Sequence, residues 1–152
     1  MSVNRIQRYR KSEAMTEDPA VLVRLLLEET IRTIRIAIDH TRAGRIAERG
    51  ESASRAVDLL TSLMINLNTE ETPDLAGGLQ RLYEFCQYRV IEGHVRGDVG
   101  CFESALPVLG DITEAWVAVL EKERAAEESD AALATSQTIA RVIEMDNFLE
   151  AL

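Results

Sequence analysis

Reactive side chains gather in one stretch of the sequence, LYEFCQYRVIEGH, at residues 82–94. It contains Cys86, one of two cysteines, and His94, one of two histidines. A thiol and an imidazole suit a zinc site or a cysteine nucleophile. On a straight helix these two residues are about 12 Å apart, whereas zinc ligands lie about 2.0–2.3 Å from their ion. Because Cys86 shares a helical face with Leu82 and Val90, we interpret it as a core residue.

Other chemical signatures are also missing from the sequence. A di-iron site in a helical bundle needs Glu-x-x-His pairs, but Ala37 precedes His40 and Ile91 precedes His94 at that spacing. Gly77–Gly78 lacks the surrounding GxxxxGK[ST] pattern of a phosphate-binding loop. We therefore predict a protein that is not an enzyme, with no catalytic residues, no metal and no cofactor.

One alternative stays open at this point, and it concerns His40. The sequence DHTRAG resembles the HxxKG pattern of histidine phosphotransfer domains, which are acidic helical bundles of similar size. In those domains a solvated histidine accepts a phosphoryl group beside a lysine. Here the third residue after His40 is Ala43, Arg42 comes one position early, and Gly44 is typical of a helix end. A phosphotransfer carrier that uses His40 is the alternative function.

Composition and charge exclude several classes of protein. The chain has 152 residues, 46% of them hydrophobic and 28% charged, which indicates one folded globular domain. A formal net charge of −9 argues against binding to nucleic acid. The apolar runs are too short to cross a membrane, and two cysteines without CxxC spacing do not form a disulfide framework. We expect a cytoplasmic protein without membrane insertion.

Hydrophobic spacing predicts helices along most of the chain. Asp18 and Pro19 mark the start of the first helix, and Gly44 marks its end. Thr72 and Pro73 repeat this start pattern for the third helix. The second helix carries an uninterrupted apolar stripe, which consists of Ala53, Ala56, Val57, Leu60, Leu63, Met64 and Leu67.

The last part of the chain predicts two further helices. Asp98 is a suitable cap for the fourth, in which Pro107 predicts a kink or a late start. The polar sequence AAEESDAALATSQ then predicts a hinge or a continuation. We therefore expect an all-α antiparallel four-helix bundle with a mobile N-terminal arm at 1–15, a bundle domain at 16–128, and a C-terminal segment at 129–152 that forms a short fifth helix.

The order of these features resembles the flagellar export chaperone family, FliS, from about Tyr9 to Leu120. The matching features are Tyr9 in the arm, TEDP at the first helix start, LVRLL within that helix, RAVDLLTSLMINL in the second helix, LYEF in the third, and Ala115–Trp116 in the fourth. The chain departs from the family pattern at Leu27, where a tyrosine is usual, and at Gly93–His94, where Ala-Asn is common.

This resemblance implies a function. It implies a cytoplasmic export chaperone that binds the disordered C-terminal segment of flagellin, prevents premature polymerisation, and keeps flagellin competent for flagellar type III secretion. Other flagellar export components are further candidate partners, and we expect a monomer or a weak homodimer. The partner-binding residues that we predict are Ile6, Tyr9, Leu22, Leu26, Tyr83 and Tyr88.

Overall fold

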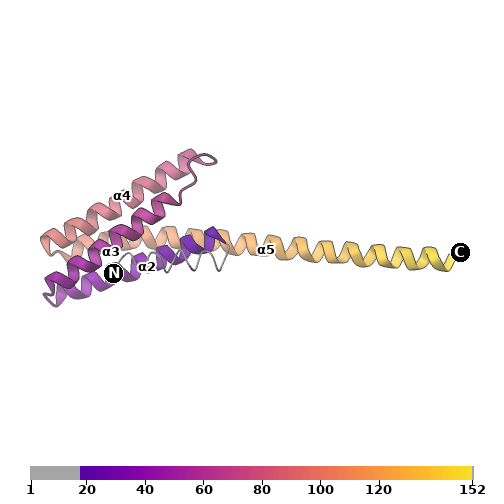
Figure 1. Ribbon diagram of the computed structural model, residues 1–152, viewed down its shortest axis with the longest axis horizontal. Coiled ribbons are helices and arrows are strands. Elements are labelled where there is room, and N and C mark those ends of the chain that lie inside the picture. Colours follow the sequence, from indigo (N-terminus) through magenta and orange to yellow (C-terminus); the bar gives the residue numbers. More distant parts are fainter. Residues whose placement is uncertain (1–17, 152) are drawn as a thin grey trace. The chain divides into compact units, whose positions relative to one another are not determined.

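The computed structural model describes residues 18–151, so Ile6 and Tyr9 of the predicted arm lie outside the described residues. The described part is built from four helices, α2 Pro19–Arg42, α3 Ile46–Ile65, α4 Pro73–Arg96 and α5 Val99–Ala151, and contains no strand (Figure 1). This confirms the predicted all-α class. The chain divides into two compact units, one up to Trp116 and one from Val117 onward, and α5 contributes to both.

Short sequence signals set most helix ends. The Asp18 side chain accepts a hydrogen bond from the Ala20 N–H at 3.0 Å, which confirms the predicted N-cap of α2. Gly44 has a φ of 70° and Gly97 a φ of 61°, a left-handed conformation that favours glycine. Gly97 directly follows α4, and Gly44 follows α2 after one intervening residue. Each glycine therefore turns the chain into the next segment.

Two predicted details of helix ends need correction. Pro73 begins α4 as predicted, but the Thr72 side chain makes no capping hydrogen bond. Its hydroxyl instead donates to the Asn68 carbonyl at 3.4 Å. Of the two alternatives predicted for Pro107, the late start is wrong, because α5 begins at Val99 and continues through the proline, and the kink stays a prediction. Asp98 caps the last helix as predicted, because the Asp98 side chain accepts a hydrogen bond from the Gly100 N–H at 2.9 Å.

The first unit is a bundle in which consecutive helices run in alternating directions. Figure 1 shows α3 returning beside α2, α4 returning beside α3, and the first part of α5 running back again. Each helix contributes one apolar face to a common core. The fully buried members of that core include Leu27, Ile34, Ala37, Ala56, Leu59, Leu60, Cys86, Val90, Phe102, Ala105 and Leu109.

A close contact joins α4 to α5 within this core. Gly93 lies against the ring of Phe102, and a Cβ atom added at Gly93 would lie 2.9 Å from two of the ring carbons. Nearby, the Arg89 Nε donates to the Ser104 hydroxyl at 2.7 Å. The absence of a side chain at Gly93 therefore lets these two helices approach at this level.

The second unit is the remainder of α5, from Val117 to Ala151, and every described side chain after Leu120 is exposed. The prediction of a separate short fifth helix is not confirmed, because α5 is continuous over 53 residues. The physical reason is composition: no glycine or proline follows Gly110, and alanine, glutamate, leucine and arginine are strong helix formers. The predicted boundaries at 16–128 and 129–152 stay predictions.

Candidate binding surface

The stretch at residues 82–94 forms part of α4, and its reactive groups do not form a reactive site. Cys86 is fully buried, and burial raises the pKa of its thiol to about 12. Tyr83 is also buried, and burial, with a smaller contribution from Cys86, raises the pKa of its phenol to about 12. Both groups stay protonated near neutral pH, so neither supplies a nucleophile or a metal ligand.

His94 has a structural role at the end of α4. The Arg49 Nη2 donates to the His94 carbonyl oxygen at 2.9 Å, and the Arg49 Nε donates to His94 Nδ1 at 3.3 Å. These contacts tie α3 to the last turn of α4, where unpaired carbonyl groups favour a cation. In the same α3 helix, Gly50 lies against the His94 ring, since a Cβ there would come within 3.0 Å of His94 Cε1.

His40 gives no support for the phosphotransfer alternative. Its Nδ1 accepts a hydrogen bond from the Arg45 Nε at 2.9 Å. Helix α2 ends at Arg42 and the chain turns at Gly44, whereas the helix of phosphotransfer domains continues through its glycine. Within residues 18–151, no three His, Cys, Asp or Glu side chains gather as a metal site would require.

The most distinctive surface of the first unit is a row of apolar side chains on α4. We call Leu82, Phe85, Tyr88, Ile91 and Val95 the α4 row. These side chains are between 40% and 76% exposed. Successive members are spaced by three or four residues, so each lies beside the next, and the row winds around the exposed side of the helix from Leu82 to Ile91. The buried side chains of the same helix, which include Tyr83, Cys86 and Val90, occupy its core face.

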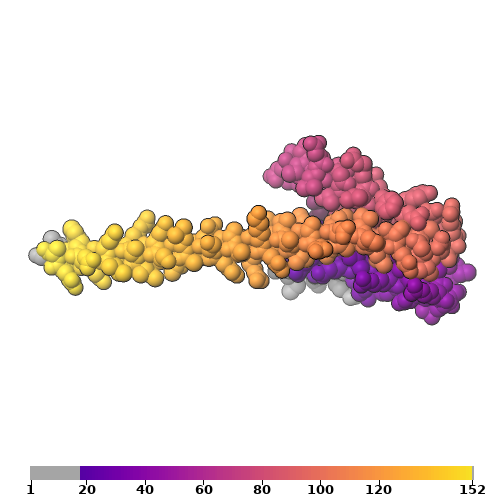
Figure 2. Space-filling model, turned by 180° about the vertical axis from the view of Figure 1, so that it is seen from behind, coloured from indigo at the N-terminus to yellow at the C-terminus, as the bar shows by residue number. Residues whose placement is uncertain are grey.

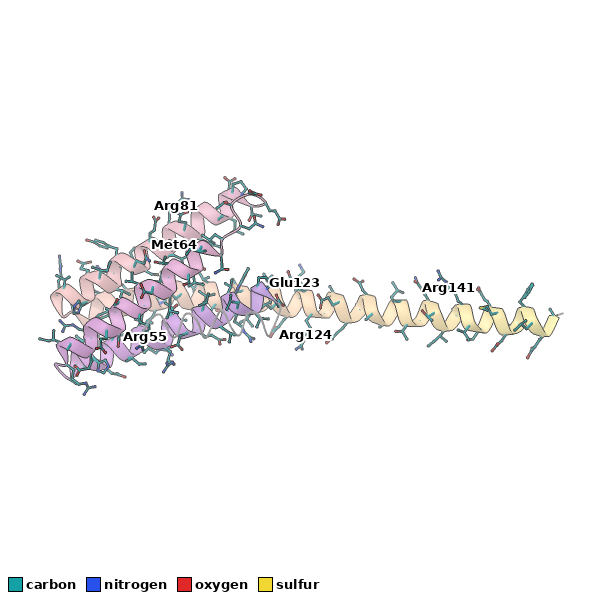
Figure 3. The ribbon with its side chains drawn as sticks, viewed as in Figure 1. Arg55, Met64, Arg81, Glu123, Arg124 and Arg141 are labelled. Carbon is teal, nitrogen blue, oxygen red and sulfur yellow. The ribbon has the colours of Figure 1, made fainter. Side chains whose placement is uncertain are left out.

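Further apolar side chains lie at the turn between α3 and α4. Ile65 is 73% exposed at the end of α3, and Leu75 is 61% exposed in the first turn of α4. Met64 and Arg81, labelled in Figure 3, mark the neighbouring parts of the two helices. Exposed apolar residues that occur in a series, rather than singly, are typical of a surface that binds a partner.

Charged side chains border the α4 row without interrupting it. The Arg89 Nη1 donates to Glu92 Oε2 at 2.8 Å, and the Arg96 Nη2 lies 3.2 Å from Glu92 Oε1. Glu92 is thereby neutralised by two arginines, so the surface between Tyr88 and Val95 carries no unpaired acid from this residue.

No helix within residues 18–151 combines the length and the hydrophobicity needed to span a membrane.

A family model described as "Flagellar protein FliS" matches residues 2–123. The chain belongs to the FliS family. Among its FliS relatives, the flagellar secretion chaperone FliS of Salmonella typhimurium is 25% identical over 113 residues, which cover 74% of this chain and 84% of the relative. The Vibrio cholerae protein of the same name is 24% identical over 115 residues, covering 73% and 85%.

The fold comparison agrees with this assignment. A solved structure titled "Crystal structure of flagellar chaperone from bacteria" matches with a TM-score of 0.66 and 21% identity, covering 80% of this chain and 99% of that one. These FliS relatives are named as secretion chaperones, not as enzymes. Residues 124–152 lie beyond the part that the family model matches.

The structure separates the predicted partner-binding residues into three groups. Tyr88 is 63% exposed and belongs to the α4 row. Leu22, Leu26 and Tyr83 are buried members of the core cluster, and a contact between them and a partner stays a prediction. Ile6 and Tyr9 lie outside the described residues.

Most of the α4 row was not among the partner-binding residues predicted from the sequence. Leu82 was assigned to the core stripe, and Phe85, Ile91 and Val95 were not chosen as partner-binding residues. A signal for them was present, because α4 carries more apolar residues than one core face needs. Only the packing of α4 shows which of these residues remain exposed.

Proposed function

We propose that this FliS-family protein is a cytoplasmic chaperone that binds the disordered C-terminal segment of flagellin. Binding prevents premature polymerisation and keeps flagellin competent for flagellar type III secretion. The names of the FliS relatives support a role in flagellar secretion. The observation that carries the assignment of the surface is the α4 row, a series of exposed apolar side chains that follow one another along α4.

The physical properties of the α4 row suit a client that folds as it binds. A disordered segment pays for its ordering when it binds, so it needs many apolar contacts spread along its length. Phe85, Tyr88, Ile91 and Val95 share the outer side of α4, and this side suits the apolar face of an amphipathic helix. Phe85 and Tyr88, at the centre of the row, provide large aromatic surfaces of the kind that dominate binding energies.

The α3–α4 turn extends this surface toward Ile65 and Leu75. A client segment longer than the α4 row would continue over these side chains. Covering the client's apolar residues in this way keeps them from pairing with other flagellin molecules. The chaperone needs no chemistry for this function, which agrees with the buried and protonated state of Cys86 and Tyr83.

The experiment that tests the proposal compares substitutions inside and outside the α4 row. Phe85→Glu and Tyr88→Glu each place a charge in the row, and Ser54→Glu places the same charge on an exposed site of α3. In calorimetric titrations with flagellin from the same source, we expect each row substitution to weaken binding about tenfold or more, or about 1.4 kcal/mol. We expect Ser54→Glu to bind as the unmodified protein does.

Two results would contradict different parts of the proposal. If the unmodified protein does not bind full-length flagellin, the proposed client is wrong. If it binds flagellin but Phe85→Glu and Tyr88→Glu bind equally well, the client is right and the α4 row is not its site. Circular dichroism of each variant establishes that a loss of binding is not a loss of folding.

A further inference from the structure

The end of α5 carries an apolar face that the described structure leaves exposed. Six large side chains between Ile139 and Leu149 are between 53% and 66% exposed, namely Ile139, Val142, Ile143, Met145, Phe148 and Leu149. Figure 2 shows this unit, in orange to yellow, as one helix with its side chains at the surface. Helix propensity alone gives a helix little stability in water, so a long helix depends on packing of its apolar face against a partner.

This segment is separate from the shared part of the family. The family model ends at residue 123, and the solved chaperone structure is matched over 99% of its length by 80% of this chain. The features that support flagellin binding lie before Trp116. The apolar face after Ile139 therefore requires its own explanation.

The spacing of the apolar side chains matches the seam of a coiled coil. Val142, Met145 and Leu149 follow one another at intervals of three and four residues, and Thr138 and Thr135 continue the same pattern toward the N-terminus. Thr135, Val142 and Leu149 occupy the a positions of a heptad repeat, and Thr138 and Met145 occupy its d positions. Ile139 and Phe148 border the seam and widen its apolar surface.

The charges beside the seam are complementary to those of an identical helix. In this heptad register Arg141 occupies a g position and Asp146 the following e position, five residues later. When two such helices pair in parallel, each g residue lies beside the following e residue of the other helix. Arg141 of each copy then faces Asp146 of the other. Figure 3 shows the Arg141 side chain on this part of α5.

The charge of the segment also favours a second copy over a strongly charged partner. Between Ile139 and Leu149 there is one base, Arg141, against two acids, Glu144 and Asp146, a net charge of −1. The acids between Glu121 and Asp130 lie outside this seam. In a parallel pair they would repel their counterparts, so we place the start of the pairing after them.

We propose that residues 135–149 of two copies pair as a parallel coiled coil, so that the chaperone forms a dimer through the ends of its α5 helices. The seam covers only about two heptads, which is short for a stable coiled coil. The dimer is therefore concentration-dependent. Its contacts are confined to the second unit and include no residue of the α4 row.

The test measures the mass of the full chain by light scattering and sedimentation over a wide range of concentrations. We expect the mass to rise from 16.9 kDa for one chain toward twice that value. Val142→Glu puts a charge in the seam and should raise the dissociation constant at least about tenfold. Asn147→Glu adds the same charge on the opposite side of the helix and should leave the dissociation constant unchanged.

A charge exchange tests the parallel pairing. Arg141→Glu places two acids beside each other and should weaken the dimer, and adding Asp146→Arg to that variant should restore it. A mass that stays at 16.9 kDa at all concentrations overturns the proposal. A dimer that persists in Val142→Glu, or that the second charge change does not restore, also overturns it. Flagellin binding in the same variants remains a separate measurement.

Discussion

The contact between Gly93 and Phe102 gives a sharp prediction about the core. A methyl group at Gly93 would lie 2.9 Å from Phe102 Cδ2 and Cε2 and 3.0 Å from Cγ. Carbon atoms pack favourably at about 3.5–4.0 Å, so the ring would have to move. Phe102 is fully buried, so its ring would have to move against other core side chains. Gly93→Ala overpacks the core at this point.

The size of the effect follows from two opposing terms. Overpacking a core costs about 1–3 kcal/mol. Replacing a helical glycine with alanine recovers about 1 kcal/mol of helix propensity. We therefore expect Gly93→Ala to lower the free energy of unfolding by about 1 kcal/mol, and by no more than about 2 kcal/mol.

Gly77 and Gly78 provide matched controls on the same helix. A Cβ atom at either position meets no atom within 4 Å. Alanine there gains helix propensity without a clash, so we expect each substitution to raise the free energy of unfolding by about 0.5–1 kcal/mol. Urea unfolding of all three variants, followed by circular dichroism and extrapolated to water, measures the differences.

The comparison contradicts the reasoning if Gly93→Ala stabilises the protein as much as Gly77→Ala does. A second check is the double variant Gly93→Ala with Phe102→Leu, in which the smaller side chain makes room for the methyl group. The double variant should then lose less free energy of unfolding than the sum of the losses in the two single variants. Strict additivity would show that the two residues do not contact each other in solution.

Three other properties follow from the structure. Folding raises the pKa of Cys86 from 9.0 and of Tyr83 from 10.0 to about 12, so the contribution of these two groups to stability should be constant below pH 9 and fall above it. In urea unfolding at several alkaline pH values, Cys86→Ala should remove about 1.4 kcal/mol per pH unit from that slope. Asp18→Ala should destabilise the protein by about 1 kcal/mol, whereas Asp18→Asn, which keeps a capping oxygen, should stay within about 0.5 kcal/mol of the original. Pro107→Ala should raise the free energy of unfolding by about 1–3 kcal/mol, because a proline inside α5 removes a helical hydrogen bond; a decrease would show that the proline serves packing.

Helix positions were largely predictable from the sequence because their signals are local. Asp18 with Pro19, and the glycines Gly44 and Gly97, act through their own backbone conformation and through neighbouring groups. The error at the end of the chain has a different origin. The polar residues after Leu120 were interpreted as a hinge or a continuation that leads into a separate helix, although they are helix formers without a glycine or proline.

The exposure of individual apolar side chains was less predictable, because it depends on packing between helices. Leu22, Leu26 and Tyr83 are apolar positions of the kind that bind a client, but the bundle buries them. Phe85 and Ile91 belong to the same helix as Tyr83, and only the direction in which α4 faces its neighbours leaves them exposed. The family, in contrast, was predictable, because the order of several weak motifs along the chain is specific even when each motif alone is not.

Calorimetric titration with two forms of flagellin from the same source tests whether this protein binds the C-terminal segment of flagellin. One form is full length, and the other lacks its C-terminal segment. We expect saturable binding of the full-length form, with a negative heat capacity change from the apolar surface that becomes buried, and no binding of the shortened form. Absence of binding to full-length flagellin, or equal binding of the two forms, would contradict the proposed function.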